Sequence, residues 1–227
     1  MTKQEVRAWI EETGVIAAVR EKSKEDALFA AEILAQSGIP VVEISLTMPQ
    51  ATSVISHLMK SIPGIIVGGG SVTQAEAARQ CLDAGAQFLT SDGFHPEVIE
   101  FGAKQNVVVI PGTLTPTEVI SAWETKSDFV KVVPCAQIGG PAYIGSLHAM
   151  FPHIPLIASG GVDQQSASKL ILAGAIAIGV GRELVPKEAI QLRQAARIGE
   201  LARRFLDFVK SGRAHLAAYT RRSSSEN

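Results

Sequence analysis

The sequence predicts a single-domain α/β protein with the (β/α)₈ architecture of a TIM barrel. Short apolar runs rich in β-branched or small residues alternate with stretches of helical pattern, and the alternation occurs eight times. It continues without a change in composition, and 227 residues is a suitable length for one such barrel. Repeated strand-then-helix units form a parallel sheet, and eight of them close into a barrel.

The predicted strands lie at residues 15–20, 41–46, 65–70, 88–92, 107–111, 129–134, 155–159 and 175–181. Predicted helices between them include 24–36, 73–84, 115–124 and 163–173. Gly38, Gly85 and Gly174 follow three of these helices, where a left-handed residue commonly ends a helix. A doubly wound open sheet is the competing architecture, because it is built from the same units.

The chain closes with a predicted amphipathic helix, roughly residues 188–209, and a polar segment after it. We expect residues 1–210 to form the barrel domain. Residues 211–227 are expected to form a solvated, mobile tail, because they contain little apolar surface to bury.

The composition excludes several classes of partner. The net charge of −1 gives no reason to expect nucleic acid or an anionic membrane. Two cysteines, Cys81 and Cys135, match neither a metal-binding spacing nor a disulfide framework. No segment has the order of a signal peptide, and no apolar run reaches about 18 residues. We therefore expect a cytoplasmic protein without a membrane partner.

A lysine interrupts a strongly apolar predicted strand, Phe-Val-Lys-Val-Val-Pro at residues 129–134. Alternation along a strand places Lys131 on the inward face with Phe129 and Val133. Burial favours the uncharged form of an amine, and an uncharged amine attacks a ketone to form a Schiff base. The alternative is a lysine whose stem packs while its ammonium group reaches solvent.

The second predicted strand carries an acidic residue on its inward face. Alternation groups Glu43 with Val41 and Ser45, so a carboxylate and the Lys131 amine can share the barrel interior. Schiff-base chemistry needs such a group to transfer protons. The alternative is a buried ion pair that only neutralises two interior charges, which is a poor source of stability.

Glycine-rich segments follow the last two strands. Ser159, Gly160 and Gly161 follow the seventh strand, and a Gly-Val-Gly run before Arg182 follows the eighth. Many barrels hold a phosphate there on exposed backbone N–H groups. Arg20 ends the first strand, beside the eighth in a closed barrel, and could add a charge-assisted contact. The alternatives are tight turns and a surface arginine.

Two hydroxyl side chains complete the predicted site. Ser71 follows a run of three glycines at the end of the third strand, and Thr47 extends the inward face of the second. Both could donate a hydrogen bond to a substrate carboxylate. Alone, the segment around Ser71 indicates a flexible loop or a helix N-cap.

Five segments, in this order and spacing, resemble the class I aldolases that cleave 2-keto-3-deoxy-6-phosphogluconate (KDPG) and 4-hydroxy-2-oxoglutarate (KHG). The resemblance covers residues 15–185 and implies a (β/α)₈ fold, a homotrimer, a 2-keto acid substrate, pyruvate as a product, no metal or other cofactor, and a cytoplasmic sugar-acid pathway. The segments are VVEISLT at 41–47, GGGSV at 68–72, IPGTLTPTE at 110–118, FVKVVP at 129–134 and SGGV at 159–162.

The resemblance also implies residue roles. Lys131 resembles the Schiff-base lysine, Glu43 the general acid/base, and Ser71 the residue that holds the pyruvate carboxylate. The implied second product is an aldehyde, glyceraldehyde 3-phosphate or glyoxylate. The implied phosphate end consists of Arg20, Ser159, Gly160 and Gly161.

Some positions depart from the family pattern. Thr47 stands where many members carry an arginine, and Ser71 replaces a threonine. Arg182 stands where a small serine commonly helps to bind phosphate, so it either strengthens anion binding or fills the phosphate site. Cys135 has no histidine nearby in sequence, so we expect an inert thiol, and we expect His95 to be a helix-start residue.

A different class of function stays open at this point. The same phosphate-end glycines occur in barrels that isomerise or cyclise phosphosugars, and a barrel can also serve as a non-catalytic binder of phosphorylated ligands. These alternatives give Lys131 no covalent role.

Overall fold

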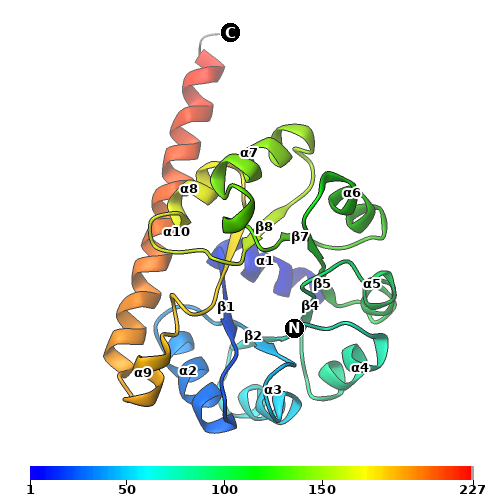
Figure 1. Ribbon diagram of the computed structural model, residues 1–227, viewed down its shortest axis with the longest axis vertical. Coiled ribbons are helices and arrows are strands. Elements are labelled where there is room, and N and C mark those ends of the chain that lie inside the picture. The colour runs from blue at the N-terminus through cyan, green and yellow to red at the C-terminus, as the bar shows by residue number, and fades with distance from the viewer. Residues whose placement is uncertain (226–227) are drawn as a thin grey trace.

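The computed structural model describes residues 1–225, with side chains through residue 218, and its helices surround a central parallel sheet (Figure 1). The strands in these residues pair in the order β5-β4-β3-β2-β1-β9-β8-β7-β6. The strand bounds are β1 Val15–Val19, β2 Val41–Ser45, β3 Ile66–Gly70, β4 Phe88–Thr90, β5 Val108–Ile110, β6 Gly112–Thr113, β7 Val130–Val132, β8 Leu156–Ser159 and β9 Ala177–Val180.

Strand β5 lies within the predicted fifth strand, and β6 continues it beyond the predicted end, after Pro111. Proline has no amide N–H to donate, which interrupts the hydrogen-bonding pattern there. The N–H of Asp128 donates to the carbonyl of Val109 at 3.0 Å, and the N–H of Lys131 donates to the carbonyl of Pro111 at 2.9 Å. These bonds close the ring between β5 and β7. The predicted (β/α)₈ barrel is therefore confirmed, and the open sheet is wrong.

Most predicted helices are confirmed within a few residues. The predicted helix at 24–36 is α2, and Gly38, Gly85 and Gly174 have left-handed φ angles of 95°, 101° and 108°. The helix bounds are α1 Lys3–Thr13, α2 Lys24–Gln36, α3 Ala51–Ser61, α4 Ala75–Asp83, α5 Pro96–Lys104, α6 Pro116–Glu124, α7 Pro141–Met150, α8 Ala167–Leu172, α9 Lys187–Gln191 and α10 Ala195–Ser225, with a 3₁₀ helix η1 at Ala136–Ile138.

The C-terminal helix differs from its prediction. Residues 188–209 do not form one helix, because Arg193 adopts a left-handed φ of 50° between α9 and α10. Helix α10 then continues past the predicted end, through Ser225. It packs closely on α8: a Cβ at Gly212 would lie 2.7 Å from the Ser168 carbonyl oxygen. No helix in residues 1–225 is long and apolar enough to cross a membrane.

Apolar side chains fill the amino-terminal half of the barrel. Helix α1, which the sequence analysis did not predict, lies across that end, and its Val6 and Ile10 pack into the interior (Figure 1). A capping box between Thr2 and Glu5 begins this helix. The polar residues Glu43, Ser45, Thr90 and Lys131 are buried toward the carboxyl ends of the strands. The inward apolar residues are Ile16, Val41, Ile66, Phe88, Val108, Ile110, Phe129, Ile157 and Ala177.

Candidate active site

Lys131 lies on β7 and points into the barrel, as predicted. Its side chain is 5% exposed, between the register partners Gly112 on β6 and Ile157 on β8. The surroundings are more polar than the apolar strand suggests. Lys131 Nζ lies 3.1 Å from Asp92 Oδ1 and donates to Thr90 Oγ1 at 3.5 Å. The alternative in which the lysine head reaches bulk solvent is wrong.

Glu43 lies on β2 and also points into the barrel. A Cβ on the neighbouring Gly70 would lie 2.4 Å from Glu43 Oε1, so the glycine at that position makes room for the carboxylate. Thr90 Oγ1 donates to Glu43 Oε2 at 2.8 Å. Because Thr90 also accepts from Lys131 Nζ, one hydroxyl group connects the predicted acid/base to the predicted nucleophile.

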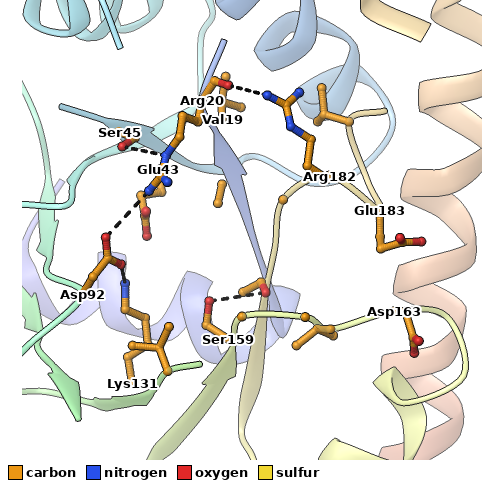
Figure 2. A pocket seen from close by; sticks show the side chains of 18 of the residues that line it. Val19, Arg20, Glu43, Ser45, Asp92, Lys131, Ser159, Asp163, Arg182 and Glu183 are labelled. Carbon is orange, nitrogen blue, oxygen red and sulfur yellow. Dashed lines mark hydrogen bonds and ion pairs between the residues drawn. The ribbon is translucent and has the colours of Figure 1, made fainter. Parts of the chain in front are cut away.

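Asp92, just beyond β4, is the carboxylate that pairs with Lys131. Its Oδ2 accepts a hydrogen bond of 2.7 Å from Ser71 Oγ. The same oxygen lies 3.7 Å from the Arg20 guanidinium (Figure 2). Burial raises the pKa of the Asp92 carboxyl, but Lys131, Ser71 and Arg20 outweigh burial and hold the pKa below its ordinary value. Sequence analysis missed both Asp92 and Thr90.

Hydroxyl groups gather beside Asp92. Ser45 Oγ lies 2.9 Å from Thr47 Oγ1 and 3.1 Å from Ser71 Oγ. Arg20 Nε donates to Ser45 at 3.2 Å, and an Arg20 NH2 group donates to Ser71 at 3.1 Å. The sequence places Arg20 at the phosphate end, whereas its guanidinium makes its hydrogen bonds with these hydroxyls. We call Lys131, Glu43, Thr90, Asp92 and Ser71 the lysine end of the site.

Ser159 is the last residue of β8, and Gly160 and Gly161 form the turn after it. Gly160 and Gly161 have φ angles of 82° and 75°, which favour glycine. A Cβ at Gly160 would lie 2.8 Å from Pro134 Cα, so the loop also packs too tightly for a side chain. Ser159 Oγ makes a long hydrogen bond of 3.5 Å to the Gly179 carbonyl. This loop brings its backbone to the cavity surface.

Arg182 follows β9 and pairs with Glu21, which sequence analysis missed. One guanidinium nitrogen lies 3.1 Å from Glu21 Oε1, and another donates to the Arg20 carbonyl at 3.1 Å. Burial raises the pKa of the Glu21 carboxyl, although the charge of Arg182 opposes it. We call Arg182, Glu21, Ser159, Gly160 and Gly161 the glycine end of the site.

A cavity of about 590 Å³ at the carboxyl ends of the strands joins the lysine end to the glycine end (Figure 2). Val19, Val133 and Val185 contribute apolar walls. Thr47 and Ser71 do not line the cavity and connect to it through Ser45. Predicted site residues that line it are Arg20, Glu43, Lys131, Ser159, Gly160, Gly161 and Arg182.

Two further side chains have the passive roles that the sequence predicts. Burial raises the pKa of the Cys135 thiol to about 11, so it stays protonated and unreactive near neutral pH. His95 precedes the first residue of α5, as expected for a helix-start residue. In the part of the chain that the structure describes, no group of three or more His, Cys, Asp or Glu side chains is arranged to hold a metal ion.

Known proteins resemble this chain over most of its length. A profile of KDPG and KHG aldolases matches residues 6–201. The 2-dehydro-3-deoxy-phosphogluconate aldolase of Treponema pallidum is 27% identical over 200 residues, covering 88% of this chain and 95% of that protein. The Zymomonas mobilis protein of the same name is 30% identical over 161 residues, covering 71% of this chain and 77% of that protein.

Solved structures agree with the sequence relatives. The KDPG aldolase of Legionella pneumophila, with pyruvate captured at low pH as a covalent carbinolamine, has a TM-score of 0.80 and 29% identity. That match covers 87% of this chain and 96% of the Legionella chain. The fold, the matched residues and the length of the match all lead to one conclusion. This chain belongs to the KDPG and KHG aldolase family.

Proposed function

We propose that this aldolase forms a Schiff base on Lys131 and cleaves 2-keto acids with a C4 hydroxyl group into pyruvate and an aldehyde. One observation carries the proposal: the amine is enclosed in the barrel and faces the cavity, and Thr90 connects it to Glu43. An enclosed amine and a second titratable group, linked by a hydroxyl, supply a nucleophile and a proton carrier.

The first stage forms the imine. The uncharged Nζ of Lys131 attacks C2 of the substrate. The carbonyl oxygen takes up one proton from Nζ and one from Glu43 and leaves as water. Glu43, in its protonated form, supplies a proton for this departure and becomes a carboxylate. The resulting protonated imine accepts electrons from the neighbouring carbon–carbon bond.

The second stage breaks the C3–C4 bond. The Glu43 carboxylate accepts the proton of the C4 hydroxyl group, and an aldehyde forms as the C3–C4 electrons move into a C2–C3 double bond. The imine electrons move to nitrogen, which gives an enamine. Glu43 returns its proton to C3. Water then hydrolyses the protonated imine, which releases pyruvate and the free amine of Lys131, and the proton freed in this step returns to Glu43.

The two ends of the cavity suit the two halves of such a substrate. At the lysine end, Ser45 lines the cavity and is hydrogen-bonded to Ser71, so this pair of hydroxyls can donate to the carboxylate next to C2. At the glycine end, the backbone of Gly160 and Gly161 and the Arg182 side chain face the remote part. Both KDPG and KHG carry an anionic group there, a phosphate or a carboxylate, so both belong to the proposed substrate class.

Trapping with borohydride tests the proposal. Pyruvate and borohydride should raise the intact mass by one reduced pyruvate, and peptide mapping should place the adduct on Lys131. A Lys131→Met variant should give no adduct, whereas Lys169→Met, on the outer helix α8, should label like the parent. An adduct on another lysine would contradict the proposal. Pyruvate release, measured with lactate dehydrogenase over a panel of 2-keto acids, would then rank the substrates.

The homotrimer and the cytoplasmic location stay predictions from the family resemblance. Multi-angle light scattering of the purified chain would measure the mass of the assembly and so test the predicted homotrimer.

A further inference from the structure

The lysine end of the cavity already contains a carboxylate that belongs to the protein. Asp92 accepts from Lys131 Nζ at 3.1 Å through one oxygen and from Ser71 at 2.7 Å through the other. The Arg20 guanidinium lies 3.7 Å from the second oxygen. An ammonium, a hydroxyl and a guanidinium thus surround this carboxylate, and Figure 2 shows the Lys131 and Arg20 side chains turned toward it. The same kinds of donor suit a substrate carboxylate.

A bound 2-keto acid would need the same place. In the imine, the substrate carboxylate is attached to the carbon that bonds Lys131 Nζ, so its oxygens must come as close to Nζ as Asp92 Oδ1 does. The Ser71 hydroxyl has a single hydrogen, and this hydrogen now points to Asp92. The substrate and Asp92 therefore compete for one donor, and two carboxylates this close repel each other.

The exposures of the two partners show which one can move. The side chain of Asp92 is 50% exposed, whereas that of Lys131 is 5% exposed. Asp92 can turn toward water with little loss of solvation, but Lys131 is held among the strands. Thr90 and Glu43 stay in place when Asp92 leaves, because their hydrogen bond does not involve it.

We propose that Asp92 is an internal competitor of the substrate: its carboxylate fills the position of the keto-acid carboxylate in the empty enzyme and is displaced when the substrate binds. This inference rests on the proposed Schiff-base function. We therefore expect the effect of Asp92 to depend on whether the ligand carries a carboxylate. Asp92 raises the concentration of keto acid that is needed for half-saturation, and it has a much weaker effect on a ketone without a carboxylate.

The test compares two ketones on matched variants. Borohydride trapping is measured against concentration for pyruvate and for hydroxyacetone, a neutral ketone, on the parent enzyme and on D92A, D92N and D92E. For pyruvate, D92A and D92N should lower the half-saturating concentration roughly tenfold, because a like charge is removed beside the carboxylate site. D92E keeps the negative charge, so its half-saturating pyruvate concentration should stay near that of the parent. The half-saturating concentration of hydroxyacetone should change by less than about threefold in each variant.

Two results would overturn the inference. A higher half-saturating pyruvate concentration in both D92A and D92N would mean that Asp92 positions the amine for attack. If the variants lowered the half-saturating concentrations of pyruvate and hydroxyacetone equally, Asp92 would act only by keeping Lys131 charged. D92N matches the parent side chain in size and guards against a folding defect.

Failure of the proposed function would be seen separately. If neither the parent nor D92A forms an adduct at saturating pyruvate, the Schiff-base proposal fails. Calorimetric pyruvate affinities of the same two proteins would still decide the competition: tighter binding to D92A supports it, and equal or weaker binding overturns it.

Discussion

The two ends of the cavity each contain an ion pair, and the pairs are built in opposite ways. At the lysine end the cation is buried and the anion is half-exposed, 5% for Lys131 and 50% for Asp92. At the glycine end the anion is buried and the cation is exposed, 6% for Glu21 and 56% for Arg182. The member near water is the one that can leave its partner at small cost in solvation.

This difference gives the two ends different tasks. An incoming carboxylate can replace Asp92, because the fixed cation remains to receive it. An incoming anion at the glycine end meets an arginine that is already paired, and drawing Arg182 away would leave the buried Glu21 charge without a partner. The lysine end thus offers a fixed positive group, whereas the glycine end offers the backbone of Gly160 and Gly161 and a restrained guanidinium.

The largest effect should come from the proton carrier of the lysine end. Replacing Glu43 by glutamine keeps the hydrogen bond to Thr90 but removes the proton-accepting group, so kcat should fall about 10²- to 10⁴-fold. Lactate dehydrogenase coupling measures the fall. Borohydride labelling of Lys131 at long incubation should still reach completion, because the amine is intact.

Glu183→Gln is the matched control for that variant. Glu183 lines the other end of the same cavity, and its replacement should change kcat less than about threefold. A similar decrease in kcat in the two variants would show that Glu43 is not the proton carrier.

A glycine at each end gives a smaller, steric test. A Cβ on Gly70 would lie 2.4 Å from Glu43 Oε1, and a Cβ on Gly179 would lie 2.6 Å from Ser159 Oγ. Gly70→Ala should therefore displace the acid/base and lower kcat roughly 10- to 100-fold. Gly179→Ala should mainly raise KM for a phosphorylated substrate. If Gly70→Ala changed KM alone, the position of Glu43 would not limit turnover.

Alternation along the strands accounts for most of what the sequence revealed. It placed Lys131 and Glu43 in the interior from β-strand periodicity alone, and both point there. The same rule applied to residues 88–92 would have grouped Phe88, Thr90 and Asp92 on one face. The pattern of residues 88–92 therefore contains a signal for both Thr90 and Asp92.

Other features depend on contacts that no local pattern contains. Glu21 and Arg182 meet only because barrel closure brings β1 beside β9. The long α10 follows from packing against α8, where Gly212 permits close approach although glycine usually weakens a helix. The direction of the Arg20 side chain likewise depends on Ser45 and Ser71, which come from other strands.

Replacing Arg182 by serine tests how restrained the guanidinium is. We expect KM for a phosphorylated substrate to rise about two- to fivefold and KM for an unphosphorylated one to stay nearly constant, since Arg182 is already paired with Glu21. Steady-state kinetics on both substrates gives the comparison. The double variant Glu21→Gln/Arg182→Ser controls for the unpaired buried carboxylate. Equal changes for both substrates would remove Arg182 from the anion site.

The smallest effect concerns stability against pH, where the two pairs should act in opposite directions. The pKa of Asp92 is lowered in the folded state, so its contribution is complete above its unfolded pKa and is lost as the pH falls through the folded value. The pKa of Glu21 is raised, so its contribution is complete below its unfolded pKa and is lost as the pH rises through the folded value. Urea unfolding between about pH 3 and 6 measures both. As the pH rises, the stability advantage of the parent over Asp92→Asn should grow by less than about 1 kcal/mol, since Asp92 is half-exposed, while its advantage over Glu21→Gln should shrink. If both stability differences changed in the same direction as the pH rises, the two carboxylates would not differ as their burial implies.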